Sequence, residues 1–142
     1  MLKGQKSMRI ALDTNILFSV VALKSRKLAG MLDWICQNHT LILSTYVLEE
    51  CRDVVQRKNA ALMPALDRFL ESLPYEIVYT PQTLPEHGLF TIRDPADEKV
   101  VYSAIAADAD LLISGDKDVL AVELERPEIM TASQFCERFS LQ

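Results

Sequence analysis

Near its N-terminus the chain carries the sequence RIALDTNILF at residues 9–18. A short apolar run leads up to Asp13, and a second apolar run follows Thr14 and Asn15. A short apolar run that ends in turn-forming residues is typical of a buried strand, and the second run reads as a helix. Asp13 therefore stands between a strand and a helix, where it could cap the helix or bind a metal ion. The rest of the sequence bears on that choice.

Predicted strands and helices alternate along the whole chain. Strands are predicted at residues 8–12, 40–44, 75–80, 110–114 and 128–131. Helices are predicted at 15–22, 25–38, 44–58, 59–73, 97–109 and 132–141, with a tight turn and short helix at 115–120 and a loop at 80–97. Pro64 is expected to kink or break its helix. The alternation predicts βαβ units, and hence an α/β fold with a mostly parallel central sheet and helices on both faces.

Length and composition are those of one globular domain. The chain has 142 residues, of which 49% are hydrophobic and 25% charged, so it is long enough to bury a core. We expect residues 8–142 to form a single domain and residues 1–7 to form a short leader. The net charge of -5 argues against a protein that holds nucleic acid by bulk positive charge. It does not exclude a nucleic-acid enzyme, because carboxylates gathered at a metal site also make the total negative.

The cysteines indicate a reducing compartment. Cys36, Cys51 and Cys136 are odd in number, far apart and outside any CxxC pair, which disfavours a disulfide framework or a zinc site. No apolar run approaches the ~20 residues that a membrane span needs, and the polar start MLKGQKS lacks an apolar signal-peptide region. We therefore expect a cytoplasmic protein with no membrane partner.

Acidic residues gather at the predicted strand ends. Asp13 follows the first strand and Asp116 the fourth, while Glu50 lies early in the helix after the second strand. The segments around the fourth strand add Asp94, Asp97, Glu98 and Asp118. Ligands of parallel sheets bind beyond the carboxyl ends of the strands, so these carboxylates could meet at one edge. Their repulsion would raise their pKa values unless a cation such as Mg²⁺ or Mn²⁺ lay among them. Such a metal cluster suits phosphodiester hydrolysis.

Each acid also has a purely structural interpretation. Asp13 could cap a helix, and Glu49 and Glu50 could be solvated charges favoured by the helix dipole. Asp94 precedes a proline, which is a typical helix start, and the Gly-Asp pair at 115–116 is common in turns. Four separate turns that all place acids at the same sheet edge are harder to explain in this way. We therefore favour the metal site.

The order of these motifs resembles the PIN domain. The resemblance rests on ALDTN at 11–15, STYVLEE at 44–50, DPADEKVVYSAIAADADLLISGDKDVL at 94–120 and EIMTASQF at 128–135. It runs from about Met8 to the C-terminus and is closest to the VapC-like ribonucleases of bacterial toxin–antitoxin systems. It implies a three-layer α/β/α sandwich around a parallel sheet. It also implies metal-dependent hydrolysis of RNA by an activated water, without a covalent enzyme intermediate.

The resemblance assigns roles to individual residues. The family's four metal-binding and catalytic acids match Asp13, Glu50, Asp97 and Asp116, with Glu50 preferred to Glu49. Ser114 would orient the acidic cluster, Asn15 would help to fix Asp13, and Asp118 and Asp94 would support the site. Substrate phosphates also need cations nearby, and we propose for this a group made up of Lys24, Arg26, Lys27, Arg52, Arg93 and Lys117. Surface charge alone would explain any single one of them.

The resemblance also implies partners, namely an RNA substrate, a second copy in a homodimer, and an antitoxin peptide that fills the acidic groove. A non-catalytic PIN-like module that binds RNA or protein stays open as an alternative. A receiver-like domain is disfavoured, because Leu12 and Thr14 flank Asp13 where a second acid would be needed. A phosphatase with a nucleophilic aspartate would need another Asp where Asn15 stands.

Overall fold

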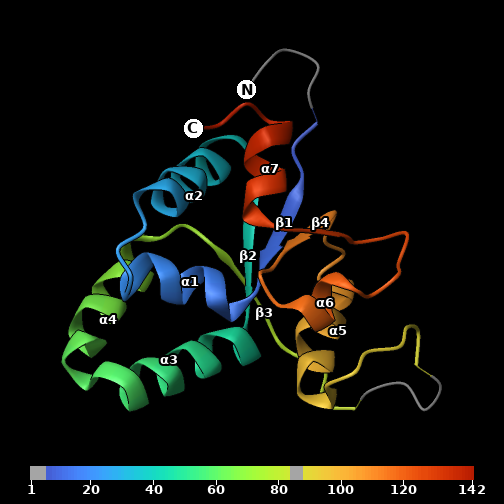
Figure 1. The fold of residues 1–142 in the computed structure, drawn as a ribbon, viewed down its shortest axis with the longest axis horizontal. Helices are drawn as coiled ribbons and strands as arrows, with labels where there is room; N and C mark the ends of the chain where they lie inside the picture. Colours follow the sequence, from blue (N-terminus) through green and yellow to red (C-terminus); the bar gives the residue numbers. More distant parts are fainter. Residues whose placement is uncertain (1–5, 84–87) are drawn as a thin grey trace.

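The computed structural model describes residues 6–83 and 88–142, which form a parallel sheet between two layers of helices (Figure 1). The strands are β1 (Arg9–Leu12), β2 (Thr40–Ser44), β3 (Glu76–Val78), β4 (Leu111–Ile113) and β5 (Glu128–Met130). Their order in the sheet is β3-β2-β1-β4-β5, and all neighbouring pairs run parallel. The predicted α/β fold is confirmed. Residues 1–5 of the predicted leader and residues 84–87 of the predicted loop lie outside the described residues.

The helices follow the predicted order. They are α1 (Thr14–Val21), α2 (Arg26–Asn38), α3 (Thr45–Asn59), α4 (Met63–Ser72), α5 (Glu98–Ala106), α6 (Lys117–Leu120) and α7 (Ala132–Arg138), with short 3₁₀ helices η1 (Ala60–Leu62) and η2 (Pro95–Asp97). Helices α1 to α4 lie on one side of the sheet, and α5 and α6 lie on the other (Figure 1). The predicted helix at 59–73 is divided into η1 and α4. Pro64 lies in the first turn of α4, where its missing N–H costs no helical hydrogen bond.

The sheet is covered on both faces, as its continuous apolar strands require. Residues 10–12 of β1 and 41–43 of β2 are buried, so apolar side chains leave each strand in both directions. Helix α7 packs on α2 through an edge-on contact of Phe135 with Trp34, whose ring centroids are 5.8 Å apart. Within the described ranges, no helix is long and apolar enough to cross a membrane.

The topological switch point of the sheet, where the direction of the strand connections reverses, lies between the carboxyl ends of β1 and β4. The connection after β1 leads to β2 on one side of β1, whereas β4 pairs with β1 on its other side. Leu12 is in register with Ile113, and the N–H of Asp13 donates a 2.9 Å hydrogen bond to the carbonyl of Ile113. Asp13 and Ser114 therefore leave neighbouring strands side by side, at the place where open α/β sheets bind ligands.

Candidate metal centre

A cavity of about 250 Å³ opens at this switch point. We call it the acidic cavity, and its lining residues are Asp13, Thr14, Asn15, Phe18, Glu50, Val54, Lys58, Asp97 and Asp116. All four acids predicted as metal ligands are among them. They come from the end of β1, from α3, from η2 and from the turn after β4. Glu49 is exposed and does not line the cavity, so the choice of Glu50 over its neighbour agrees with the geometry.

Asp13 is the most deeply placed of these acids, with 5% of its surface exposed. Its Oδ1 accepts a 2.7 Å hydrogen bond from the N–H of Thr14, and its Oδ2 accepts a 2.7 Å bond from the hydroxyl of Ser114. Burial raises the pKa of this carboxyl, the two hydrogen bonds oppose the rise, and the carboxylates of Glu50 and Asp116 add to it. Asp13 therefore caps α1 and also lines the cavity, so the two interpretations of its sequence position are compatible.

The turn after β4 is held by short-range hydrogen bonds. The Oγ of Ser114 accepts a 3.0 Å bond from the N–H of Asp116, whose Oδ1 caps α6 through a 2.8 Å bond from the N–H of Asp118. Asn15 was expected to fix Asp13, and this expectation needs correction. The side-chain oxygen of Asn15 accepts a 3.2 Å bond from the N–H of Gly115 instead. Asn15 thus ties α1 to the turn that carries Asp116.

Glu50 is held by two hydroxyl groups that sequence reasoning did not single out. The hydroxyl of Thr14 donates to Oε1 of Glu50, and the hydroxyl of Tyr46 donates to Oε2 at 3.0 Å. Burial and the carboxylate of Glu50 raise the pKa of Tyr46 above its usual value, so the hydroxyl stays protonated and can donate. The sequence signal was the spacing, because Tyr46 and Glu50 are four residues apart and share one face of α3.

Asp97 closes the cavity from the opposite layer of helices. Burial raises the pKa of its carboxyl to about 6, with smaller contributions from the nearby carboxylates, Asp116 first and Asp94 next. Asp94 caps η2 by accepting a 3.0 Å bond from the N–H of Ala96, as its place before a proline predicted. Carboxylate oxygens of Asp94, Asp97 and Asp118 all lie within 4.8 Å of one another.

The closest group of carboxylates is thus not the predicted set of four, and only Asp97 belongs to both. Arg93 forms a bidentate pair with Asp118, with nitrogen–oxygen distances of 2.9 and 2.8 Å. This pair lowers the pKa of the Asp118 carboxyl and offsets its charge.

The cations that were predicted to bind RNA do not line the acidic cavity. Arg93 is paired with Asp118, and Arg52 pairs with Asp67 at 2.6 Å. Lys24 precedes α2, Arg26 and Lys27 begin it, and Lys117 begins α6. Among the described residues, the acidic cavity is lined by a different cation, Lys58, near the C-terminal end of α3.

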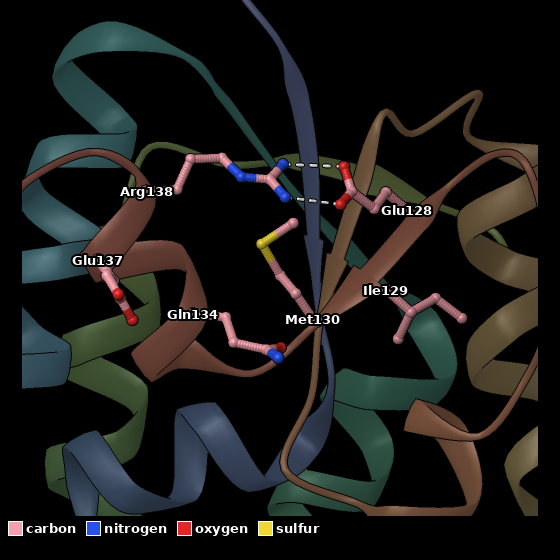
Figure 2. A pocket seen from close by; sticks show the side chains of 6 residues that line it. All are labelled: Glu128, Ile129, Met130, Gln134, Glu137 and Arg138. Atoms are coloured by element: carbon pink, nitrogen blue, oxygen red, sulfur yellow. Dashed lines mark hydrogen bonds and ion pairs between the residues drawn. The ribbon is translucent and has the colours of Figure 1, made fainter.

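A second pocket lies along β5 and α7 (Figure 2). Its lining residues are Glu128, Ile129, Met130, Gln134, Glu137 and Arg138. Arg138 and Glu128 pair across it through two hydrogen bonds of 2.8 and 2.7 Å, as the dashed lines of Figure 2 show. The pair neutralises the two charges, and the pocket contains no residue of the predicted site. The acidic cavity is therefore the better candidate for chemistry.

The donor set of the acidic cavity fits a hard divalent cation. Four carboxylates line it, which suits Mg²⁺ or Mn²⁺ rather than zinc, and among residues 6–83 and 88–142 no cysteine or histidine lines it. The raised pKa values of Asp13 and Asp97 have burial as their main cause and mutual repulsion as a further cause. A bound cation would offset both effects, because it favours the ionised form of each carboxyl.

Comparisons with known proteins agree with this fold. The chain is similar to one in the crystal structure of VapBC2 from Rickettsia felis bound to a DNA fragment from their promoter. The two are 23% identical, with a TM-score of 0.65, and the match covers 87% of this chain and 97% of that chain. At this identity the likeness shows the fold alone. A search of the curated proteins found no significant match. A family model of the PIN domain matches residues 9–118, which is most of the chain, and the chain therefore belongs to the PIN domain family.

Proposed function

We propose that this chain is a metal-dependent endoribonuclease and the toxin of a toxin–antitoxin pair. It would hydrolyse phosphodiester bonds of RNA with an activated water. The observation that carries the proposal is the convergence of four carboxylates, from four separate elements, on one cavity at the switch point of the sheet. Membership of the PIN family supports it, as does a fold shared with a chain of a VapBC2 structure.

The four cavity carboxylates, Asp13, Glu50, Asp97 and Asp116, would hold Mg²⁺ or Mn²⁺. Such an ion lowers the pKa of a bound water and stabilises charge on the leaving oxygen. The contribution of the protein is to hold these carboxylates in position. Ser114 and the N–H of Thr14 hold both oxygens of Asp13, and the hydroxyls of Thr14 and Tyr46 hold both oxygens of Glu50. Carboxylates that are fixed before the substrate arrives need little rearrangement during the reaction.

The wider organisation is part of the same proposal. Residues 8–142 would form one PIN domain, and the protein would form a homodimer. The antitoxin partner is suggested by the solved VapBC2 structure, whose chain shares this fold. A basic antitoxin segment would suit the negative acidic cavity, since it could occupy the site where RNA phosphates and the metal ion would bind.

The test is cleavage of a labelled RNA mixture by purified protein with Mn²⁺, with Mg²⁺ and with EDTA. Glu50→Gln is the informative variant, because the glutamine oxygen can accept the bond of one hydroxyl and its amide N–H can donate to the oxygen of the other, while the charge is lost. Glu49→Gln is its matched control, with the same change one residue away on an exposed position. We expect metal-dependent cleavage that Glu50→Gln reduces at least about a hundredfold and Glu49→Gln leaves intact.

Growth of the expressing host adds a second readout. Wild-type protein should arrest growth, and Glu50→Gln should relieve the arrest while accumulating to higher levels. A folded wild-type protein that binds the metal ion but cleaves none of the RNAs would favour the non-catalytic binding module. Equal cleavage by wild type and Glu50→Gln would assign the activity to a contaminant.

A further inference from the structure

The acidic cavity carries one feature that its carboxylates do not explain, which is a cation on its wall. Glu50, Val54 and Lys58 line it from α3, and their spacing of four residues places them along one face of that helix. Thr14 and Phe18 line it from α1 with the same spacing. The two faces oppose each other, so the cavity follows the junction of α1 and α3 from the carboxylates towards Lys58.

Lys58 is held in place without an acidic partner. Its ammonium lies 5.1 Å from the centroid of the Phe18 ring, over the ring face. Within the described part of the chain, Lys58 forms no ion pair, whereas Arg52 on the same helix pairs with Asp67. An ammonium that rests on an aromatic face keeps its N–H donors for a ligand, while its position is restricted.

The position of Lys58 indicates which kind of ligand it would bind. Eight residues separate it from Glu50, which is about 12 Å along the helix axis. Lysine side chains on a helix lean towards the N-terminus, and here that direction leads to the carboxylates. A chain of phosphodiesters suits this arrangement, because one phosphate can lie at the metal site and a neighbouring phosphate at Lys58. The attraction of the four acids for an ammonium is the alternative explanation of its position, and the binding experiment distinguishes the two.

We propose that Lys58, positioned by Phe18, binds a backbone phosphate of the nucleic acid next to the phosphate that is hydrolysed. This inference rests on the proposed function, because it concerns the same cavity. Lys58 would be a binding residue, and Phe18 would be a positioning residue that acts through it. The contact would be to the backbone, so it would add affinity and register without selecting a base sequence.

Binding of a short, labelled single-stranded RNA of mixed sequence tests this directly. Affinity is measured over a series of salt concentrations with Ca²⁺, an ion that carboxylates bind, and the RNA is checked for integrity afterwards. Lys58→Gln should weaken binding about three- to tenfold at low salt and reduce the slope of log affinity on log salt by about 0.7. Lys58→Arg should keep most of the affinity, and Phe18→Leu should show a smaller loss in the same direction.

Arg57→Gln is the matched control. Arg57 is exposed, as Lys58 is, and lies next to it on α3, but it does not line the cavity. Arg57→Gln therefore removes the same charge from a position outside the cavity. Equal losses for Arg57→Gln and Lys58→Gln would overturn the proposal, because general surface charge would explain both. A Lys58→Gln variant with altered Mn²⁺ affinity but an unchanged salt slope would also overturn it, and would make Lys58 a counter-ion of the carboxylates.

Cleavage in Mn²⁺ separates this inference from the proposed function. If the wild type cleaves RNA, Lys58→Gln should raise KM more than it lowers kcat, because the contact exists before and during the reaction. Cleavage by the wild type with identical constants for Lys58→Gln would overturn the phosphate contact and leave the nuclease standing. A wild type that neither binds nor cleaves RNA would overturn both.

Discussion

The hydroxyl of Ser114 donates a 2.7 Å hydrogen bond to Oδ2 of Asp13, and this bond joins the ends of β4 and β1. Both side chains are buried, and the same Ser114 oxygen accepts a bond from the N–H of Asp116. One serine therefore holds the carboxylate of Asp13 and the backbone of Asp116. It also opposes the effect of burial on Asp13, since a hydrogen bond to the ionised carboxyl favours that form.

Replacing Ser114 by alanine should therefore affect both stability and metal binding. We expect Ser114→Ala to lower the free energy of unfolding by about 1–2 kcal/mol, because one buried and one partly buried hydrogen bond are lost. Mn²⁺ affinity should fall about tenfold or more, since the orientation of Asp13 is released. Urea denaturation and a Mn²⁺ titration measure the two effects.

Ser103→Ala provides the comparison. Ser103 is also buried, and its hydroxyl donates a 2.8 Å bond to Thr80, away from the cavity. Ser103→Ala should lower the free energy of unfolding but leave the affinity for Mn²⁺ unchanged. Metal affinities that fall equally in both variants would mean that the loss reflects general destabilisation.

Asp97 should make the metal-free protein less stable at neutral pH. Its pKa in the folded protein, about 6, lies above the ordinary 3.8, so the folded state disfavours the charged form. As the pH falls through 6 towards 4, the folded protein takes up this proton first, and the destabilisation disappears. In EDTA at pH 7, Asp97→Asn should thus be more stable than the wild type by about 1 kcal/mol, after allowance for solvent screening.

The advantage of Asp97→Asn should shrink to near zero by about pH 4 and reverse when Mn²⁺ is added, because the ion stabilises the charged form. Thermal unfolding across this pH range, with EDTA and with Mn²⁺, provides the measurement. If the difference in stability between the two proteins in EDTA did not change with pH, the folded state would not raise the pKa of the Asp97 carboxyl, and this prediction would be wrong.

Tyr46 should act through Glu50. Tyr46→Phe removes the 3.0 Å hydrogen bond to Oε2 and keeps the ring, so the packing of α3 is retained. We expect a roughly tenfold loss of metal affinity or of cleavage, which is less than Glu50→Gln should cause. Tyr102→Phe serves as the control, because the hydroxyl of Tyr102 bonds the N–H of Leu89 outside the cavity. Equal metal affinity and equal cleavage by Tyr46→Phe and the wild type would show that Tyr46 does not act through Glu50.

Much of this arrangement could be predicted from the sequence, because parallel strands bring their carboxyl ends to one edge. That rule alone placed Asp13 and Asp116 together, although they lie far apart in the sequence. The choice of Glu50 over Glu49 needed the family resemblance, since both stand early in α3. The structure agrees with it, because Glu50 turns to the cavity and Glu49 to solvent.

The partners of the charged side chains could not be predicted in the same way. Arg93 stays a predicted RNA contact, but the sequence did not show that its guanidinium pairs with Asp118, which comes from a different element. Asn15 reaches Gly115 rather than Asp13 because α1 turns its first residues towards the β4 turn. Lys58 was overlooked because its sequence neighbours are polar. Its spacing of eight residues from Glu50 becomes informative only when α1 is known to face that side of α3.

The most direct measurement is Mn²⁺ binding by calorimetry to the wild type, to Asp116→Asn and to Asp53→Asn. Asparagine can still cap α6, so Asp116→Asn should fold while losing a ligand charge. Asp53 is exposed on α3 and does not line the cavity, so its variant loses the same charge elsewhere. We predict that Mg²⁺ competes with Mn²⁺ in the wild type, that Asp116→Asn binds at least about tenfold more weakly, and that Asp53→Asn binds as the wild type does. Equal affinities for all three proteins would contradict a metal centre at the switch point of the sheet.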